Sequence, residues 1–228
     1  IVSFKPNKEG YAQVVEYDRV SNVTGRFKTV NGPTLLHLPK IYRSVLQSRH
    51  RNGAIYSLDY KSLEPRVLLA TSGTLPIEGG EKDTYEYVRC SLFMNNEEVT
   101  RDVVKKIVLS ELYGAGLETL RQRLPNVVNL ELIVGKIAEW FGLNTLQQKL
   151  FDEWKQTGYK FINNFYGRRV KTETTHTLIN HYVQSTAVDV AMLGFMNILD
   201  YVSELDKLDD IVPMFILHDA LILDVNEN

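Results

Sequence analysis

The stretch Ala54-Ile-Tyr-Ser-Leu-Asp-Tyr-Lys-Ser-Leu-Glu-Pro-Arg66 places one carboxylate, Asp59, at the end of an apolar strand pattern. Alternate side chains of a strand share a face, so Ile55, Ser57 and Asp59 point to the same side. Pro65 suits the first turn of a helix, where its missing N–H costs nothing. The stretch therefore predicts a strand that ends in Asp59 and is followed by a helix. By itself, an aspartate in this setting is more often a turn former or a cap than a metal ligand.

A second aspartate has the same setting near the other end of the sequence. His218-Asp219 lies between two apolar arms, 214–217 and 220–223, which predicts a hairpin with a polar turn. Asp59 and Asp219 are 160 residues apart in the chain. If folding brings them together, two such carboxylates would hold a pair of Mg²⁺ ions about 3.5–4 Å apart for in-line phosphoryl transfer. Neither aspartate is specific on its own.

Composition limits the class of protein. The 228 residues, of which 44% are hydrophobic and 24% charged, predict a soluble globular chain with one large domain or two interlocked subdomains. No run of about 18 uncharged apolar residues occurs, so we expect no membrane span. The single cysteine, Cys90, excludes an intramolecular disulfide and a Cys-rich zinc site, and it favours a reducing compartment. Any metal must therefore take oxygen ligands.

The net charge of −2 does not by itself indicate a nucleic-acid binder, because phosphate neutralisation usually requires a basic chain. Local basic clusters qualify this argument, although such clusters are usually solvated faces.

Helical patterns fill the middle of the sequence, between strands that come early and late. Residues 1–53 read as short strands and turns. One helix is expected from Asn95 to Tyr113, with Glu97 and Glu98 at its positive N-terminal end. Two more are expected, one from about 144 to 157 with Asn144 as its cap, and one from about 175 to 202. This order predicts an α+β fold rather than a repeated βαβ unit.

Two of the expected helices carry polar side chains along one face. Arg101, Lys105, Leu109 and Tyr113 follow one another at i+4 steps. They form either an ordinary charged surface or a triphosphate clamp, because cations one turn apart can bridge successive phosphates. The last helix carries a stripe of His176, Asn180 and Gln184, which either satisfies neighbouring backbone groups or reads a DNA minor groove.

Taken together, these segments resemble the motifs of family A DNA polymerases, the DNA polymerase I family. Asp59-Tyr-Lys-Ser-Leu-Glu-Pro-Arg66, Arg101-x3-Lys105-x7-Tyr113-Gly114 and Leu217-His-Asp219 are similar to its first, second and third polymerase motifs. Further matches in the family's order are Thr24-Gly-Arg-Phe27 with Leu35 to Pro39, Phe165 to Arg169, and Asn180 to Asp189. The resemblance spans about residues 22 to 225, and Leu112-Tyr-Gly-Ala-Gly116 is most similar to the phage replicative branch.

The resemblance implies a right-hand polymerase fold, with an antiparallel palm sheet, helical fingers and no thumb in this chain. We expect palm residues in 1–70 and 166–228 and fingers in 71–165. The implied activity is template-directed addition of deoxynucleotides to a primer 3′-OH, with two Mg²⁺ ions. The implied partners are primer–template DNA, dNTPs and processivity or replisome factors, without a membrane. The implied location is the cytoplasm of a bacterium or a phage-infected cell, with an organelle as an alternative.

The resemblance also assigns residue roles. Asp59 and Asp219 would be catalytic metal ligands, with the Tyr60 carbonyl as a further ligand and Lys105 as a catalytic cation. Glu64 would be a steric gate against a ribose 2′-OH. The other nucleotide contacts would be Arg101, Lys105, Leu109, Tyr113 and Tyr85, and the DNA contacts would be Arg26, Asn180, Gln184, Arg168 and, beside the primer end, His218.

Four positions depart from the family's pattern. Ala220 replaces an acid, Asp102 a second arginine, Tyr85 a phosphate-binding histidine, and Leu109 an aromatic that stacks on the nucleotide. Ala220 removes an auxiliary carboxylate and leaves two, whereas Asp102 and Tyr85 predict weaker binding of the triphosphate. Leu109 puts sugar discrimination at its position in question.

Two other functions remain open at this point. A single-subunit RNA polymerase shares both aspartates and the second motif, but Glu64 and Thr24-Gly-Arg26 argue against it. An inactive remnant that only binds nucleic acid is the other alternative. Clustered carboxylates argue against it, because they repel phosphate.

Overall fold

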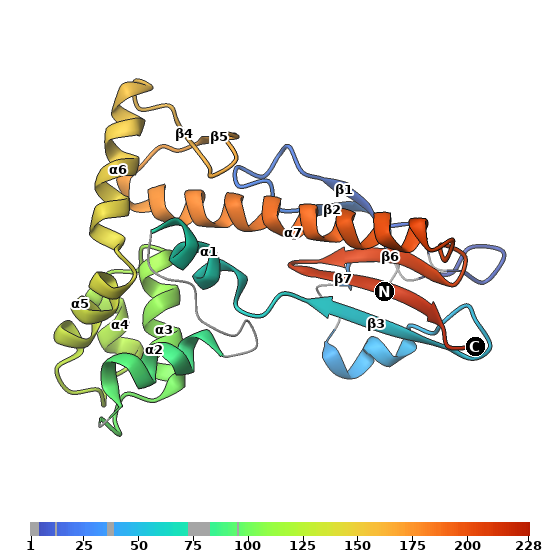
Figure 1. Cartoon of the computed structure of the whole chain (residues 1–228), viewed down its shortest axis with the longest axis horizontal. Helices are drawn as coiled ribbons and strands as arrows, with labels where there is room; N and C mark the ends of the chain where they lie inside the picture. The colour runs from blue at the N-terminus through green and yellow to red at the C-terminus, as the bar shows by residue number, and fades with distance from the viewer. Residues whose placement is uncertain (1–4, 12, 36–38, 73–82, 95) are drawn as a thin grey trace. The chain divides into compact units, whose positions relative to one another are not determined.

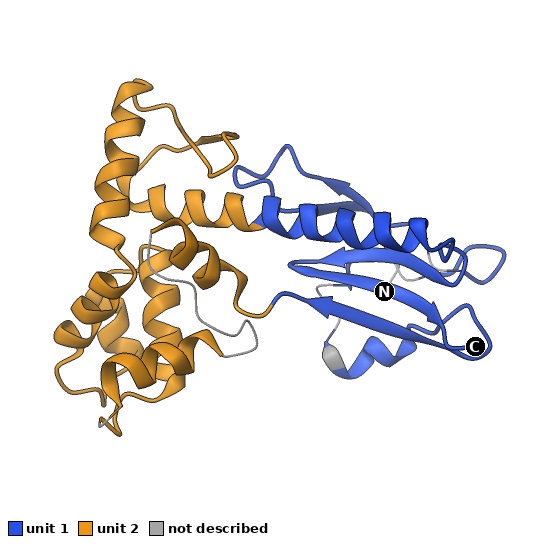
Figure 2. Ribbon diagram, viewed as in Figure 1, with its two compact units in different colours: residues 1–60, 188–228 blue, residues 61–187 orange. Residues whose placement is uncertain are grey.

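The computed structural model describes the chain except for residues 1–4, 12, 36–38, 73–82 and 95. It divides into two compact units (Figure 2), which we call the sheet unit, residues 1–60 and 188–228, and the helical unit, residues 61–187. The range expected for the fingers, 71–165, falls inside the helical unit, which also takes in residues 61–70 and 166–187.

The sheet unit is built on a three-stranded antiparallel sheet in the order β3-β7-β6 (Figure 1). Its strands are β3 (Gly53–Asp59), β6 (Ile211–Leu217) and β7 (Ala220–Asn226). β7 is the central strand and is buried from Ala220 to Asp224. β6 and β7 form the predicted hairpin, with His218 and Asp219 between them. An early strand is thus paired with late ones, and the predicted α+β class is confirmed.

Side-chain hydrogen bonds attach the N-terminal segment to the rest of the sheet unit. This segment contains the antiparallel pair β1 (Glu16–Asp18) and β2 (Lys28–Asn31), followed by the 3₁₀ helix η3 (Lys40–Val45). The Tyr17 hydroxyl donates to the Ile216 carbonyl at 2.7 Å and accepts from the Ile216 N–H at 3.0 Å. Arg19 forms an ion pair with Asp189. The segment that carries Arg26 is therefore anchored at Tyr17, in the middle of β1, and at Arg19, just after it.

The helical unit packs short helices around a buried centre. Its elements are α1 (Leu63–Thr71), α2 (Thr84–Phe93), α3 (Arg101–Leu112), α4 (Leu117–Arg123), α5 (Leu130–Trp140), α6 (Leu143–Gln156), the strand pair β4 (Phe161–Asn163) and β5 (Arg169–Lys171), and η4 (Thr175–Thr177). The long helix α7 (Leu178–Glu204) begins in this unit and ends in the sheet unit.

The apolar stripe predicted for α3 is confirmed. Val104, Ile107, Val108 and Leu112 are each at most 2% exposed, and α3 packs on α2 and α5. Because this stripe faces inward, the cations on the other side of α3 face outward.

The predicted start of α3 is wrong. The helix begins at Arg101, because the Thr100 hydroxyl caps it by accepting a hydrogen bond from the Val103 N–H at 3.3 Å. The two glutamates expected in its first turn lie in the turn before the helix. Asn95, the expected first residue, lies outside the described residues.

The predicted cap of α6 is also wrong. The helix begins at Leu143 after Gly142, whose φ of +62° is left-handed, so Asn144 is already inside the first turn. The end expected near Gly158 is confirmed by α6 and its left-handed glycine. α2, α4 and α5 were not predicted. None of the described helices is both long and apolar enough to span a lipid bilayer.

Candidate active site

Asp59 and Asp219 lie at the same end of the three-stranded sheet. Asp59 is the last residue of β3 and pairs with Ala220, the first residue of β7. The Tyr60 N–H donates to the Asp219 carbonyl at 3.2 Å, so the hydrogen-bonded ladder continues from β3 into the hairpin turn. The antiparallel register therefore brings the backbones of two distant aspartates together, as predicted.

The hairpin turn keeps these polar groups accessible to solvent. His218 has a φ of +58°, the left-handed backbone that tight hairpin turns use. The His218 and Asp59 side chains are exposed, and Asp219 is half-buried. Ala220, in contrast, is 5% exposed and is the cross-strand partner of Asp59. Cross-strand partners share a face, so an acid at this position would stand beside Asp59, and this chain has only a methyl group there.

Tyr60 is held in place by one contact of its ring and one of its backbone N–H. Its ring packs on Phe195 of α7, with 5.7 Å between ring centroids. Gly194 makes this possible, because a Cβ at that position would overlap the Tyr60 hydroxyl. Burial raises the pKa of this hydroxyl above its ordinary value. The ring on one side and the N–H bond to Asp219 on the other therefore orient the Tyr60 backbone.

The donor groups at this end of the sheet fit Mg²⁺ in kind, because they are two carboxylates and a carbonyl oxygen. Among the described residues, no group of three or more His, Cys, Asp or Glu side chains could hold a metal. Mg²⁺ commonly keeps waters and takes substrate phosphates beside one or two carboxylates, and a two-carboxylate site is of that type.

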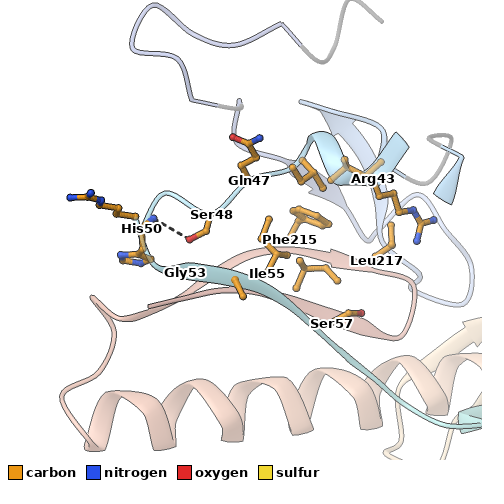
Figure 3. A pocket seen from close by; sticks show the side chains of 14 residues that line it. Arg43, Gln47, Ser48, His50, Gly53, Ile55, Ser57, Phe215 and Leu217 are labelled. Carbon is orange, nitrogen blue, oxygen red and sulfur yellow. Dashed lines mark hydrogen bonds between the residues drawn. The ribbon is translucent and has the colours of Figure 1, made fainter. Parts of the chain in front are cut away.

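A groove of about 660 Å³ lies on the face of the sheet that carries Asp59. Ile55 and Ser57 of β3 and Phe215 and Leu217 of β6 line it (Figure 3), and η3 with the following turn borders it. Figures 1 and 3 both show α7 along the sheet, and in Figure 3 it runs on the side away from these side chains. The groove thus lies between this face of the sheet and η3 with the turn that follows it.

In the helical unit, both predicted cations of α3 lie near one aromatic ring of α2. The guanidinium carbon of Arg101 is 5.5 Å, and the ammonium nitrogen of Lys105 5.9 Å, from the centroid of the Tyr85 ring. Burial, together with the charges of Glu64 and Asp83, raises the pKa of Tyr85 to about 12. The ring is therefore neutral and attracts both cations through its negative face. The predicted contact of Tyr85 with phosphate stays a prediction.

A carboxylate that the sequence analysis did not select completes this cluster. Asp83 is the N-cap of α2, and it also forms an ion pair with Arg101 at 2.6 Å. The hydrogen bond from Arg101 holds the pKa of Asp83 below its usual value. The sequence does contain one sign of this role. Asp83 lies two residues before Tyr85, and aspartate is a typical N-cap residue of a helix.

Tyr113 and Glu64, both predicted to contact the nucleotide, contact each other. The Tyr113 hydroxyl lies 2.9 Å from a Glu64 carboxylate oxygen and donates to it. Glu64 is in the first turn of α1, where the helix dipole favours a negative charge. Its position is thus compatible both with the predicted steric gate and with an ordinary helix-end charge. Leu109, one turn before Tyr113, is half-buried.

Gly114, which follows Tyr113, has two reasons to be glycine. Its φ is +68°, and a Cβ there would lie 2.7 Å from the His176 carbonyl oxygen. The close approach places the end of α3 against η4, just ahead of α7. The glycine of the Tyr-Gly pair in the second motif is therefore explained by packing inside the helical unit.

Arg26 lies in a turn that is built by its neighbours. The Asn22 side-chain oxygen accepts from the N–H and the hydroxyl of Thr24, at 3.0 and 2.9 Å, and Gly25 has a φ of +77°. Thr24 is 5% exposed, and Arg26 is half-buried. The companion segment, Leu35 to Pro39, falls partly outside the described residues, at 36–38.

The amide stripe of α7 is only partly satisfied by protein groups. The Asn180 side-chain oxygen is buried and accepts no hydrogen bond from the described part of the chain, and Gln184 is half-buried. Arg168, a predicted DNA contact, donates to the Ser185 carbonyl at 3.1 Å. The structure thus gives Arg168 a position-fixing bond to α7, while its predicted contact with DNA stays a prediction.

The predicted site residues fall into two sets. The sheet unit carries Asp59, Tyr60, Asp219, His218 and Arg26, and the helical unit carries Glu64, Tyr85, Arg101, Lys105, Leu109, Tyr113, Arg168, Asn180 and Gln184. The first set is rich in acids at a sheet end, and the second in cations and rings on helices.

Comparison with solved structures finds the POL domain of Pol1 from M. smegmatis, in a complex with DNA primer-template and dNTP. It matches with a TM-score of 0.76 at 17% identity, over 97% of this chain and 43% of that chain. This chain has the fold of a polymerase POL domain. In sequence, a DNA polymerase of Mycobacterium phage D29 is 27% identical over 144 residues, which are 59% of this chain and 23% of the phage protein. No protein-family model matches.

The polymerase fold and the phage relative together confirm the predicted resemblance to family A DNA polymerases. The chain spans less than half the length of each of these two proteins.

Proposed function

We propose that this chain is the palm and fingers part of a template-directed DNA polymerase, which adds deoxynucleotides to a primer 3′-OH. The observation that carries the proposal is the pairing of β3 with β7, which puts Asp59 and Asp219 at one end of an antiparallel sheet. The POL domain with the same fold was solved with primer-template DNA and dNTP, which supports these two partners.

Asp59, Asp219 and the Tyr60 carbonyl would hold two Mg²⁺ ions. When bound, such ions supply an activated attacking oxygen and stabilise the charge that develops on the leaving oxygen. The residues of this chain would fix where that chemistry happens, through a strand register and a ring packed on α7.

Lys105 and Arg101 would bind the triphosphate and neutralise the pyrophosphate that leaves. Charge-assisted bonds from lysine and arginine to phosphate are among the stronger polar contacts in proteins. Lys105 is exposed on α3, one turn from Arg101, so both can reach a single triphosphate. Glu64, beside Tyr113, would crowd a ribose 2′-OH and so favour deoxynucleotides.

Arg26 and Gln184 would contact the minor groove of the primer–template, where each base pair offers an acceptor in a similar place. Asn180 and Arg168 would support them, and His218 would lie beside the primer end. Processivity or replisome factors would be further partners.

Primer extension on a DNA template with Mg²⁺ tests the proposal directly. Extension with dNTPs in clear preference to rNTPs is the expected result. Preference for rNTPs would favour a single-subunit RNA polymerase instead. Binding of DNA without extension, in the chain and in a longer form that contains it, would favour a remnant that only binds nucleic acid.

A further inference from the structure

The guanidinium of Arg101 is occupied on both of its terminal nitrogens. Nη2 donates to Asp83 at 2.6 Å, and Nη1 donates to Asp102 at 3.3 Å. Arginine binds a phosphate most strongly through two parallel N–H···O hydrogen bonds from one edge of the guanidinium. In this structure both terminal nitrogens of Arg101 contact carboxylates. The plane of the guanidinium lies near the Tyr85 ring.

The two carboxylates differ in how firmly they are held. Asp83 uses one oxygen to cap α2, accepting from the Glu86 N–H at 2.9 Å, and the other to bind Arg101. Its side chain is 24% exposed, whereas that of Asp102 is 78% exposed and its bond to Arg101 is longer. A carboxylate fixed by a helix end loses little freedom when it pairs, so Asp83 is the stronger partner.

Lys105 provides an internal comparison. It lies near the same ring, at 5.9 Å, and within the described part of the chain it has no carboxylate partner. An incoming polyphosphate therefore meets an ammonium group without such a partner at Lys105, whereas at Arg101 it competes with an existing ion pair.

We propose that Asp83 competes with the incoming triphosphate for Arg101 and thereby sets the affinity for the nucleotide. This inference rests on the proposed function and concerns the regulation of that same site. The carboxylate opposes binding because it occupies Nη2 of Arg101 and neutralises the guanidinium charge that would otherwise attract the phosphates. Removal of its charge is expected to tighten nucleotide binding, although it deletes a contact.

The test measures dATP and inorganic tripolyphosphate binding to the chain by calorimetry, and KM and kcat for dATP in primer extension. Asp83→Asn is the informative variant, because asparagine caps a helix about as well as aspartate does. Asp102→Asn is the matched control, since it removes a neighbouring charge that is exposed. We expect Asp83→Asn to tighten binding and lower KM about two- to fivefold with kcat unchanged, and Asp102→Asn to change both less than about 1.5-fold.

The same substitutions in an Arg101→Ala background complete a double-mutant cycle. If Asp83 acts through Arg101, Asp83→Asn loses its effect there. A folded Asp83→Asn protein with unchanged or weaker binding would overturn the inference, and so would an equal gain in the Arg101→Ala background. If neither Arg101→Ala nor Lys105→Ala weakens dATP binding, the proposed nucleotide clamp itself is wrong, which is a different result.

Discussion

The two sets of site residues are held in place by different forces. In the sheet unit, backbone hydrogen bonds between β3, the turn and β7 place Asp59 and Asp219 at the same end of the sheet. In the helical unit, the Tyr85 ring lies near both Arg101 and Lys105, and carboxylates also pair with Arg101; these are side-chain contacts that a ligand can replace.

This difference has a chemical consequence. Catalytic metal ligands must hold a fixed geometry, and a strand register is hard to shift, since a slip by one residue turns every side chain to the other face. Groups that bind and release a substrate need exchangeable partners, and surface ion pairs are weak enough to exchange. The comparison predicts that mutations in the sheet unit affect chemistry without loosening the fold, whereas those in the helical unit change affinity.

Asp59→Asn or Asp219→Asn should cause the largest loss. Each substitution removes a negative charge that would hold the metal ions. Those ions stabilise the transition state by several kcal/mol, so kcat should fall about 1,000-fold or more. An amide fits the same exposed strand-end sites, so the melting temperature should hardly change. Steady-state primer extension and thermal melting measure both effects, with Asp200→Asn, exposed on α7, as the control. Near-parental extension by either variant would remove the metal-ligand assignment.

Lys105→Ala should lower kcat/KM for dNTPs about 10- to 100-fold, because a charge-assisted contact is worth about 1.5–3 kcal/mol. Its neighbour Lys106 is also exposed but lies on a different face of α3, so Lys106→Ala should have little effect. Arg101→Ala should cost less than Lys105→Ala, since Arg101 is already paired with Asp83. Binding of primer–template should be unaltered in all three variants. An equal loss of DNA and dNTP binding would instead indicate a generic basic patch.

Gly114→Ala should destabilise the helical unit alone, by about 1–3 kcal/mol, because its φ is left-handed and its Cβ would meet the His176 carbonyl. Gly135→Ala is a matched control in the middle of α5, where a Cβ meets nothing within 4 Å. That change should stabilise by about 0.5–1 kcal/mol. Urea unfolding followed by hydrogen exchange would locate both effects. Protection lost equally in the β6–β7 hairpin would contradict the separation of the two units.

Glu64→Ala should produce the smallest of these effects, a shift of about tenfold in the ratio of kcat/KM for rNTPs and dNTPs, equal to about 1.4 kcal/mol. The physical reason is steric, since removal of the carboxylate leaves room for a 2′-OH. Tyr113→Phe serves as the control, because it removes the bond to Glu64 and keeps the bulk of both residues. If Glu64 is only a helix-end charge, the protein should melt earlier with its sugar preference unchanged.

How much of this could be read from the sequence depended on how local each signal was. The strand ending at Asp59, the hairpin around His218 and the stripe of α3 were predicted, because each is encoded by adjacent residues at strand or helix spacing. α5 was not predicted, although Leu130, Ile133 and Ile137 are buried at helical spacing, so that signal was present and overlooked. The predicted starts of α3 and α6 were wrong, because several residues near each start could act as the N-cap. Which of them does so depends on the path of the backbone before the helix.

The sequence by itself determined the order of the motifs, the residue types at the site and the face of each element on which they lie. Only the tertiary structure decided that Asp59 pairs with Ala220, and that Asp83 holds Arg101 beside Tyr85. The first depends on the register between strands far apart in the chain, and the second on the packing of α2 against α3. Local periodicity determines which face a side chain takes, whereas the partner on that face is chosen by contacts between distant segments.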